Sequence, residues 1–285
     1  MIERFEVTDS ALGMLKRSAT IDRATVPRVP ALTTEILTAM HAREVAAVVV
    51  PGFYSPERCA AAVQGVDSGR AIEWWLGHIQ TDMNYIGTPY SVALQKPATL
   101  KRYHREAIAN TRKVRAMFTP FESPVDKLMT ELDETWPGGA RVRRGPEGRY
   151  FVGLIRLMRE AGRDDGLMHV DDIRLTPSER LWSANVYLQV PPKGGELALW
   201  NLKPGPKTNL FYRFMLRYAF EDGVQEIADR VLGKPAHVIK VKTGDLVLLD
   251  SARPHAVRGF STGVRLSMQT FMTVNAPSEP IQLYS

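Results

Sequence analysis

A series of short strand-like segments fills the second half of the chain and limits the folds that it can adopt. After Arg149, runs of β-branched and aromatic residues alternate with clusters of glycine, proline and aspartate, which is typical of short strands joined by turns. The predicted strands span residues 151–159, 181–190, 196–200, 237–241, 246–250, 256–259 and 264–274. So many short strands in so little sequence favour a β-sandwich or jelly roll.

The first half of the chain is mainly helical by pattern. Ser55-Pro56 and Ser123-Pro124 each combine a capping serine with a proline at the first helical position. The predicted helices span residues 33–44, 55–66, 100–117 and 123–135, and residues 46–50 form a predicted buried strand. We expect these helices to brace one sheet of the jelly roll.

Two segments interrupt this simple order. Residues 71–91 are rich in aromatic side chains without a clear period, which suits a loop. These side chains either line a pocket beneath the loop or simply pack under it as ordinary apolar contacts. Residues 210–232 form a predicted helical insertion within the strand series, and such an insertion can act as a lid. With no internal repeat and no low-complexity linker, we predict one domain over residues 1–285, with a scaffold at 1–140 and the jelly-roll core at 141–285.

Composition narrows the class of protein further. The chain has 285 residues, of which 44% are hydrophobic, enough to bury a large core. No apolar run approaches the ~20 residues that cross a bilayer, and the start lacks the order of a signal peptide, so we expect a cytoplasmic protein without a membrane partner. The single cysteine, Cys59, cannot form an intramolecular disulfide, and we predict it to be a small buried hydrophobic residue on a helix.

The formal charge of +6 does not indicate nucleic acid as a partner. Basic residues are spread along the chain among 31 acidic ones, and no zinc-finger spacing or RNA-binding signature is present. The densest basic cluster comprises Arg141, Arg143, Arg144 and Arg149. We interpret this cluster as a solvated face or a rim that attracts anions.

The segment His169-Val170-Asp171 carries the first part of a predicted metal site. In an extended segment His169 and Asp171 share one face, and an imidazole beside a carboxylate supplies two of the three ligands of a facial 2-His-1-carboxylate iron site. His255 follows the predicted strand 246–250, and a jelly roll can bring it beside the other two residues. By contrast, His104 lies among arginines and is predicted to be exposed, and His237 begins a strand and is not predicted to be a ligand.

Arg265 and Ser267 add a predicted anion site. They alternate on one face of the strand 264–274, ten or more residues after His255. An arginine fork with a hydroxyl binds a carboxylate in a fixed orientation, and each charge-assisted bond is worth about 1.5 to 3 kcal/mol. A dicarboxylate anchored there can reach the metal with its other end.

The second half of the chain resembles the iron(II) and 2-oxoglutarate-dependent oxygenases. Within them it is most similar to the carrier-independent aliphatic halogenases and their hydroxylase relatives that act on free or acylated amino acids. The resemblance covers roughly residues 145–272 and rests on Gly145-Pro146-Glu147-Gly148, Ile155-Arg156-Leu157, His169-Val170-Asp171, Gly194-Gly195-Glu196-Leu197, Trp200-Asn201-Leu202, Gly244-Asp245, His255 and Arg265. It implies a double-stranded β-helix, also called a cupin-like jelly roll, mainly β with flanking helices.

The resemblance also implies a reaction. Fe(II), 2-oxoglutarate and O2 are the expected cofactor and cosubstrates, and hydroxylation of an unactivated C–H bond of a small molecule accompanies the release of succinate and CO2. The halogenases carry glycine where this chain has Asp171, so halogenation is disfavoured. Desaturation, epimerisation and cyclisation remain alternatives, as does a metal-containing jelly-roll module that binds a small ligand without chemistry. An amino acid derivative, an alkaloid and a nucleotide all remain open as the substrate.

Pocket residues follow from the same strand pattern. If one face of strand 181–190 looks into the barrel, Ser183, Asn185 and Tyr187 can bind the cosubstrate or the substrate; the opposite register would place Trp182, Val186 and Leu188 there. The further candidates for substrate binding are Arg156, Arg258, Trp75 and Tyr85. Arg156 has an alternative structural role as an ion-pair partner of Asp172 or Glu196.

Overall fold

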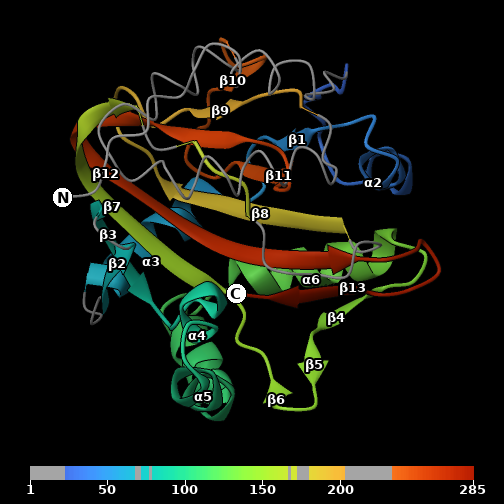
Figure 1. Ribbon diagram of the computed structural model, residues 1–285, viewed down its shortest axis with the longest axis vertical. Helices are drawn as coiled ribbons and strands as arrows, with labels where there is room; N and C mark the ends of the chain where they lie inside the picture. The colour runs from blue at the N-terminus through green and yellow to red at the C-terminus, as the bar shows by residue number, and fades with distance from the viewer. Residues whose placement is uncertain (1–22, 68–71, 77–78, 166–167, 172–179, 203–232) are drawn as a thin grey trace, which may run out of the picture.

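A computed structural model describes residues 23–67, 72–76, 79–165, 168–171, 180–202 and 233–285. Its main feature is a large curled sheet of mostly antiparallel strands (Figure 1). The strands along its path are, in spatial order, β1 Ala47–Val50, β11 Leu246–Asp250, β8 Arg180–Gln189, β12 His255–Val274, β7 Leu154–Asp165, β3 Ile79–Ile86 and β2 Ile72–Leu76. Strand β13, Ile281–Tyr284, pairs with β12 and with β4, Ala140–Val142, and a separate ribbon joins β5, Arg144–Gly145, to β6, Gly148–Arg149.

Strand β12 links this large sheet to a second layer. Its first residues, His255 to Val257, pair with β9, Leu197–Leu199, which in turn pairs with β10, His237–Ile239. The rest of β12 runs between β7 and β8. Figure 1 shows β9 and β10 at the top of the molecule, away from the long red strand that continues to the opposite side. Strand β12 therefore belongs to the second layer at its start and to the large sheet over the rest of its length.

The prediction of two separate strands at 256–259 and 264–274 was wrong in this respect, because the structure has a single strand. The pairing of β12 with β7 shifts register between Arg258 and Phe260 and again between Phe260 and Val264. Gly263 has a φ of +92° in this region, which glycine adopts without strain. The glycine therefore marks a bulge within the strand, whereas the sequence pattern suggested a turn.

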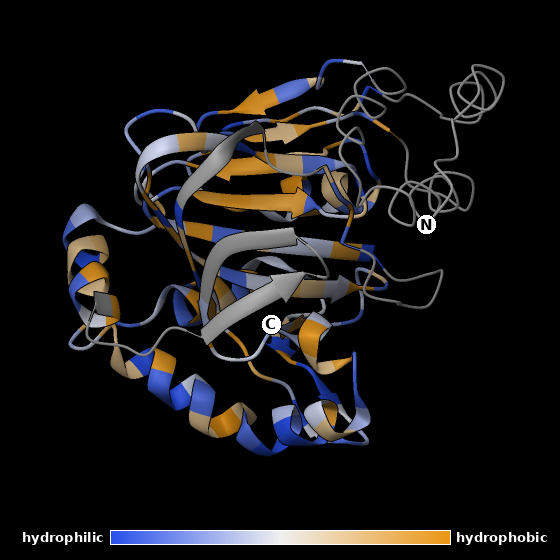
Figure 2. Ribbon diagram, turned by 60° about the vertical axis from the view of Figure 1, so that its left-hand side comes forward, coloured by the Kyte–Doolittle hydropathy of each residue, from blue (hydrophilic) through white to orange (hydrophobic). Residues whose placement is uncertain are grey.

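Helices cover one face of the large sheet. They are α2 Thr34–His41, α3 Pro56–Asp67, α4 Tyr90–Ala93, α5 Pro97–Ala116 and α6 Pro124–Thr135. The Ser123 side chain accepts a hydrogen bond from the backbone N–H of Asp126 at the start of α6, as its capping pattern predicts. Figure 2 shows the apolar colour on strands in the middle of the molecule, whereas the helices carry a mixture of apolar and polar colours. The expected arrangement of a sheet braced by N-terminal helices is confirmed.

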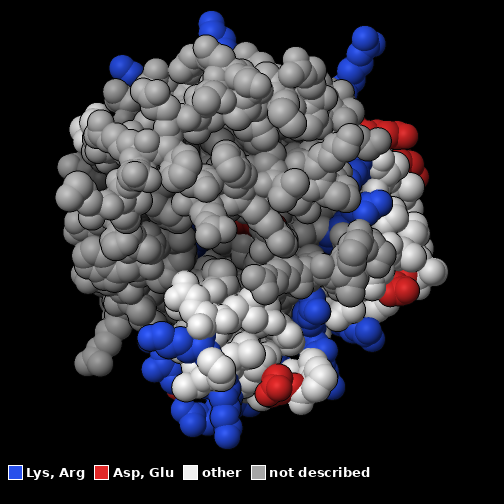
Figure 3. Space-filling model, in the orientation of Figure 1, with Lys and Arg blue, Asp and Glu red and all other residues white. Residues whose placement is uncertain are grey.

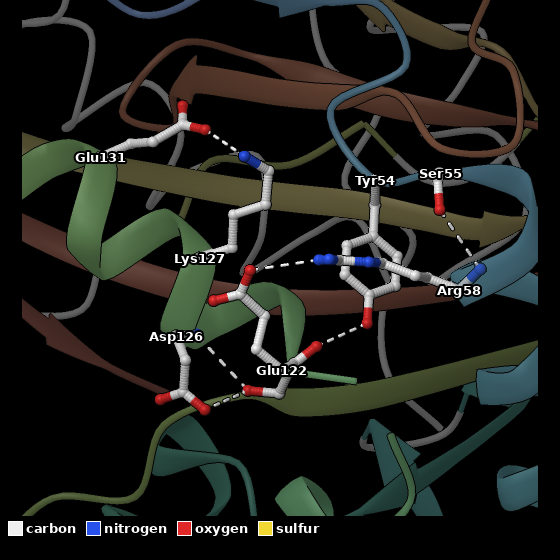
Figure 4. Close-up of polar contacts among 8 residues, drawn as sticks. Tyr54, Ser55, Arg58, Glu122, Asp126, Lys127 and Glu131 are labelled. Carbon is white, nitrogen blue, oxygen red and sulfur yellow. Dashed lines mark hydrogen bonds and ion pairs between the residues drawn. The ribbon is translucent and has the colours of Figure 1, made fainter. Parts of the chain in front are cut away.

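Polar contacts, shown in detail in Figure 4, tie the loop before α3 and the start of α3 to the segment that precedes α6. The Tyr54 hydroxyl donates to the backbone carbonyl of Glu122 at 2.6 Å, and Arg58 Nη1 donates to the Glu122 carboxylate at 3.1 Å. Lys127 and Glu131 form an ion pair one turn further along α6. Cys59 lies on α3 with 1% of its surface exposed, and burial raises the pKa of its thiol to about 11. Its predicted role as a buried residue on a helix is confirmed.

The two faces of β8 have different surroundings. Trp182, Val186 and Leu188 belong to the large apolar core that includes residues of the helices. On the opposite face, Tyr187 packs with residues of β9 and β11, including Leu197. Successive side chains of a strand point to opposite faces, so Ser183, Asn185 and Tyr187 all face the space between the two layers.

Residues 71–91 differ from the prediction of a loop. They contain the hairpin of β2 and β3, and β3 extends the large sheet by pairing with β7, with Tyr85 opposite Arg156. The aromatic and β-branched content of the segment favours strands, although its side chains do not alternate cleanly. Pairing with β7 therefore decides the structure of this segment. The predicted insertion at 210–232 and residues 1–22 lie outside the described residues.

A close approach between two loops requires glycine at position 244. Gly244 has a φ of +91°, and a Cβ at this position would lie 2.3 Å from the backbone oxygen of Tyr54. Its N–H donates to the Tyr187 carbonyl at 2.7 Å, and its carbonyl accepts from Tyr54 N–H at 2.9 Å. Gly244 therefore joins β8 to the loop that precedes α3.

The basic residues at 141–149 form part of a broader positive surface. In Figure 3, Lys and Arg side chains gather on the lower part of the molecule, the region where Figure 1 places α4, α5, β5 and β6. Arg141, Arg144 and Arg149 are exposed, whereas the Arg143 guanidinium lies over the rings of Tyr150 and Tyr284 at 5.4 and 5.3 Å. No helix within the described ranges is both long enough and apolar enough to cross a membrane.

Candidate metal centre and cosubstrate pocket

Backbone pairing brings the two candidate histidine ligands together. His169 and His255 form an isolated antiparallel bridge, and each N–H donates to the carbonyl of the other residue at 2.9 Å. The N–H of Asp171 donates to the carbonyl of Ser251 at 2.9 Å, which fixes the second half of the His169-Val170-Asp171 segment. His169 and His255 are far apart in the sequence. Backbone pairing of the segment 169–171 with residues 251–255 brings them together.

The three side chains converge on one point. His255 Nε2 lies 3.5 Å from Asp171 Oδ2, and His169 Nε2 lies 3.8 Å from Asp171 Oδ1. The two imidazole rings are 4.3 Å apart between centroids. One candidate ligand atom from each residue lies within 4.8 Å of the others. This is the spacing of groups that can bind one metal ion from one side.

The orientation of His255 suits it to bind a metal through Nε2. Its Nδ1 lies 2.9 Å from the carbonyl oxygen of Arg253, and because a carbonyl only accepts, Nδ1 carries the proton. Burial and the neighbouring His169 lower the pKa of His255 to about 4. The ring is therefore neutral near pH 7, with the Nε2 lone pair directed toward Asp171.

The donor set fits a divalent metal ion. Asp171 Oδ2 is buried, and it has no hydrogen-bond partner among the residues that the structure describes. A buried carboxylate oxygen without a donor is costly unless a cation neutralises it. Two imidazoles and one carboxylate, arranged on one side, form the 2-His-1-carboxylate set that favours iron(II) and leaves open coordination positions.

A buried guanidinium lies in the same interior. Arg265 is 3% exposed, its Nη2 donates to the Tyr187 hydroxyl at 3.2 Å, and its Nη1 lies 3.5 Å from the sulfur of Met158. Within the described part of the chain, Arg265 has no ion pair with a carboxylate, and its Nε has no hydrogen-bond partner. Burial lowers the pKa of Arg265 from its usual value. This arrangement leaves a positive charge available for an anionic ligand.

A row of polar residues crosses four strands beside this guanidinium. Ser267 lies opposite Tyr187 on β8 and opposite Arg156 on β7, and Arg156 lies opposite Tyr85 on β3. Directly opposed residues of antiparallel strands point to the same face, so all four side chains share the interior face with Arg265. Ser267 is fully buried, and its hydroxyl has no partner among the described residues. The row therefore places one hydroxyl without a described partner, that of Ser267, beside the buried Arg265.

The remaining predicted site residues occupy different surroundings. Asn185 is buried and its Nδ2 donates to the Ser183 hydroxyl at 3.5 Å, one row along the same face. Arg258 is half-buried on β12, where its backbone exchanges hydrogen bonds with the segment that leads into β9. Trp75 lies on β2, and the structure does not describe its side chain. Asp172, the alternative ion-pair partner of Arg156, also lies outside the described residues.

Two other histidines differ in their surroundings. The prediction that His104 is exposed was wrong: it is 8% exposed, its Nδ1 lies 2.9 Å from the Arg149 carbonyl, and its ring packs against Tyr150. The charged neighbours along the sequence lie on another side of α5 and concealed this burial. His237 begins β10, and its Nε2 lies within hydrogen-bond distance of Asn201 and of the Ala24 carbonyl.

Sequence reasoning missed one buried ion pair beside the centre. Asp250 ends β11 and Arg253 follows in the turn, and their side chains are 1% and 0% exposed. The signal available in the sequence was a charged pair immediately before Pro254-His255. Such a pair reads as solvated when the turn is assumed to lie on the surface.

The curled large sheet, the second layer and the bracing helices define a double-stranded β-helix, the fold of the iron(II) and 2-oxoglutarate-dependent oxygenases. The predicted fold class is therefore confirmed. The chain is similar in structure to an N-substituted L-amino acid dioxygenase from Burkholderia ambifaria AMMD, with 15% identity, a TM-score of 0.63 and coverage of 88% of this chain and 91% of the other. It is also similar to a structure of an N-substituted L-amino acid dioxygenase from the same organism in complex with alpha-KG. That comparison gives a TM-score of 0.60 and 14% identity, with the same coverage of 88% and 91%. No protein-family model matches the sequence, and no curated protein has significant sequence similarity to it.

Proposed function

We propose that this protein is an iron(II)- and 2-oxoglutarate-dependent dioxygenase that hydroxylates an unactivated C–H bond of a small molecule. The observation that carries the proposal is the joint placement of two kinds of unsatisfied group. The Asp171 carboxylate lies against two imidazoles, and its buried Oδ2 has no hydrogen-bond partner among the described residues; Arg265 is buried without a carboxylate in the same part of the chain. A metal ion and a dicarboxylate satisfy both at once.

In this proposal His169, Asp171 and His255 hold the metal. Bound Fe(II), together with O2 and 2-oxoglutarate, supplies the oxidising power, and succinate and CO2 are released. The Arg253 carbonyl keeps the proton of His255 on Nδ1, so that Nε2 stays available as a ligand. Asp171 contributes the negative charge that reduces the cost of holding a dication beside a buried ring.

The cosubstrate pocket is assigned to the polar face of the large sheet. Arg265 binds the distal carboxylate of 2-oxoglutarate, with Ser267 and Tyr187 as hydroxyl partners and Asn185 one row away. The Tyr187 hydroxyl already accepts from Arg265, which leaves its own proton free to be donated to the ligand. The anchored end of the ligand orients its keto acid end toward the metal centre.

The substrate is assigned to the part of the interior beyond this anchor. Arg156 and Tyr85 lie on the same face as Ser267 and continue its row across β7 and β3. The pKa of His255 is lowered in part by the charge of Arg156, which supports its placement near the centre. Arg258, Ser183 and Trp75 complete the proposed substrate residues.

A screen for succinate release tests the proposed function. The first compounds to test are amino acids and N-substituted amino acids, because the similar Burkholderia enzyme acts on N-substituted L-amino acids. Alkaloids and nucleotides follow. We expect succinate only when Fe(II), 2-oxoglutarate, O2 and the correct substrate are all present, and a product heavier by one oxygen atom. Oxygen consumption that stays at the buffer rate with every compound, although metal and 2-oxoglutarate bind, would indicate a binding module instead.

A further inference from the structure

A buried ion-pair cluster lies directly beneath the turn that carries His255. Arg253 Nε donates to Asp250 Oδ2 at 3.2 Å, and Arg253 Nη2 donates to the backbone carbonyl of Arg43 at 3.2 Å. The Arg43 guanidinium lies on the same carboxylate oxygen, with Nε 3.9 Å from Asp250 Oδ2. Arg43 itself has a φ of +65°, which is uncommon outside glycine. The cluster joins the segment before β1 to the end of β11.

The turn at residues 251–254 offers its backbone carbonyls to the metal centre and its surroundings. The Ser251 carbonyl accepts from Asp171 N–H, and the Arg253 carbonyl accepts from His255 Nδ1, both at 2.9 Å. The Pro254 carbonyl accepts from Trp200 N–H at 3.0 Å. Two of the three candidate metal ligands are therefore oriented by this one turn.

Two backbone hydrogen bonds hold the start of the turn. Asp250 N–H donates to the Ala46 carbonyl at 2.9 Å, and Ser251 N–H donates to the Leu181 carbonyl at 3.1 Å. Between these points and His255, the only side chain in the turn that reaches into the interior with a charge is that of Arg253, which is fully buried. Pro254 disfavours the helical backbone conformation at Arg253, which limits the directions that its carbonyl can take. The Arg253 side chain selects among them.

We propose that the Asp250–Arg253 ion pair is a positioning device for the metal centre, which holds the turn 251–254 so that its carbonyls orient His255 and Asp171. This inference rests on the proposed function. A buried ion pair contributes little net stability, because desolvation of both charges offsets their attraction. Its directional contacts instead fix one arrangement of the turn. Outer hydrogen-bond partners of metal ligands change metal affinity by roughly 10- to 100-fold when they are altered.

The test compares Co(II) binding with folding in the full-length apoprotein, without 2-oxoglutarate or substrate. In the double variant Asp250→Leu with Arg253→Met, both charges of the fully buried pair are removed, and Arg43, whose side chain is 20% exposed, loses only a contact of 3.9 Å. We expect its denaturant midpoint to stay close to that of the wild type, while Co(II) affinity falls roughly 10- to 100-fold and the visible absorption of bound Co(II) changes. Arg253→Lys keeps the charge without the fork and should give an intermediate loss.

A buried aspartate outside the turn provides the matched control. Asp245 is 2% exposed and accepts from Gly52 N–H and Arg28, and it has no contact with the turn 251–254 in the described structure. Asp245→Asn should lower stability and leave Co(II) affinity unchanged. The inference is overturned if Arg253→Lys, or a folded double variant, binds Co(II) with wild-type affinity and an unchanged spectrum. If the wild type itself binds no Co(II), or His255→Ala binds it equally well, the proposed metal site fails instead.

Discussion

Arg265 and Tyr187 are joined by a hydrogen bond of 3.2 Å, and the guanidinium carbon lies 5.0 Å from the centre of the Tyr187 ring. Neither partner brings a negative charge, although Arg265 is almost fully buried. A guanidinium in such surroundings gains more from an incoming carboxylate than an exposed one does, because water does not compete. This relationship is the basis of the proposed anchor for 2-oxoglutarate.

Replacing Arg265 should weaken cosubstrate binding selectively. In Arg265→Gln we expect the Kd of 2-oxoglutarate for the Mn(II)-loaded protein to rise roughly 10- to 150-fold, the equivalent of about 1.5 to 3 kcal/mol. Arg265→Lys keeps the charge but not the fork, and should lose less. Calorimetric titration measures both, and unchanged affinity in Arg265→Gln would remove Arg265 from the pocket. Mn(II) affinity without 2-oxoglutarate should stay at the wild-type value.

Replacing Ser267 by alanine should weaken 2-oxoglutarate binding without lowering the stability of the apoprotein. Its fully buried hydroxyl has no partner among the described residues, so Ser267→Ala removes an unsatisfied group from the apoprotein and should leave it as stable as the wild type or more stable. The same change should weaken 2-oxoglutarate binding by up to roughly tenfold. Urea unfolding and calorimetry measure the two effects.

Thr270 offers the matched control for this variant. Its hydroxyl is also fully buried without a described partner, but it lies opposite Ala184, on the helix-covered face of the sheet. Thr270→Val should therefore stabilise the apoprotein in the same way and leave 2-oxoglutarate affinity unchanged. Equal losses of affinity in both variants would argue against Ser267 as a direct contact.

Arg156 should separate substrate binding from cosubstrate binding. Arg156→Leu is expected to bind Mn(II) and 2-oxoglutarate within roughly threefold of wild type, a difference of under 1 kcal/mol. Substrate-dependent succinate release should fall at least tenfold, through a higher KM for the substrate. A variant that loses 2-oxoglutarate affinity instead would place Arg156 in the cosubstrate pocket. The control is Arg265→Gln, for which the opposite pattern is expected.

Two glycines with positive φ should differ in their cost of substitution. Gly52 has a φ of +63°, and a Cβ there would have no atom within 4 Å, whereas the Cβ of an alanine at 244 would lie 2.3 Å from the backbone oxygen of Tyr54. Gly52→Ala should cost about 1 to 2 kcal/mol of unfolding free energy, from backbone conformation alone. Gly244→Ala should cost more than about 3 kcal/mol, because the backbone must also move. Denaturant unfolding with equal costs would show that the contact relaxes freely.

Much of the fold could be predicted from the sequence because local sequence signals mark where many of its strands and helices begin and end. The serine and proline at the start of α6 and the strand at Leu246–Asp250 follow directly from local chemistry. The hairpin of β2 and β3 could not, because its pairing with β7 depends on a partner about 70 residues away and its own pattern is irregular. Irregular pairing within β12 likewise depends on contacts with β7 that no local signal reports.

Some features of the candidate site could likewise be predicted from the sequence, and others could not. The alternation of His169 with Asp171 and of Arg265 with Ser267 is a property of extended strands, so the shared faces could be predicted. The Asp250–Arg253 pair could not, because a charged residue in a turn is usually solvated and its burial depends on the segment around Arg43. His104 was misjudged for the same reason, since its burial comes from Tyr150 and the Arg149 carbonyl.

Metal binding by three matched variants tests the central claim most directly. Calorimetric titration of the full-length apoprotein with Mn(II), under 2-oxoglutarate, should give one ion per chain for the wild type. In His169→Ala, Asp171→Ala and His255→Ala we expect saturable binding to be lost while each variant still unfolds cooperatively. His104→Ala should bind one ion as the wild type does, since His104 lies against Tyr150 and away from the triad. Retention of one tightly bound ion in any of the three triad variants would contradict the account.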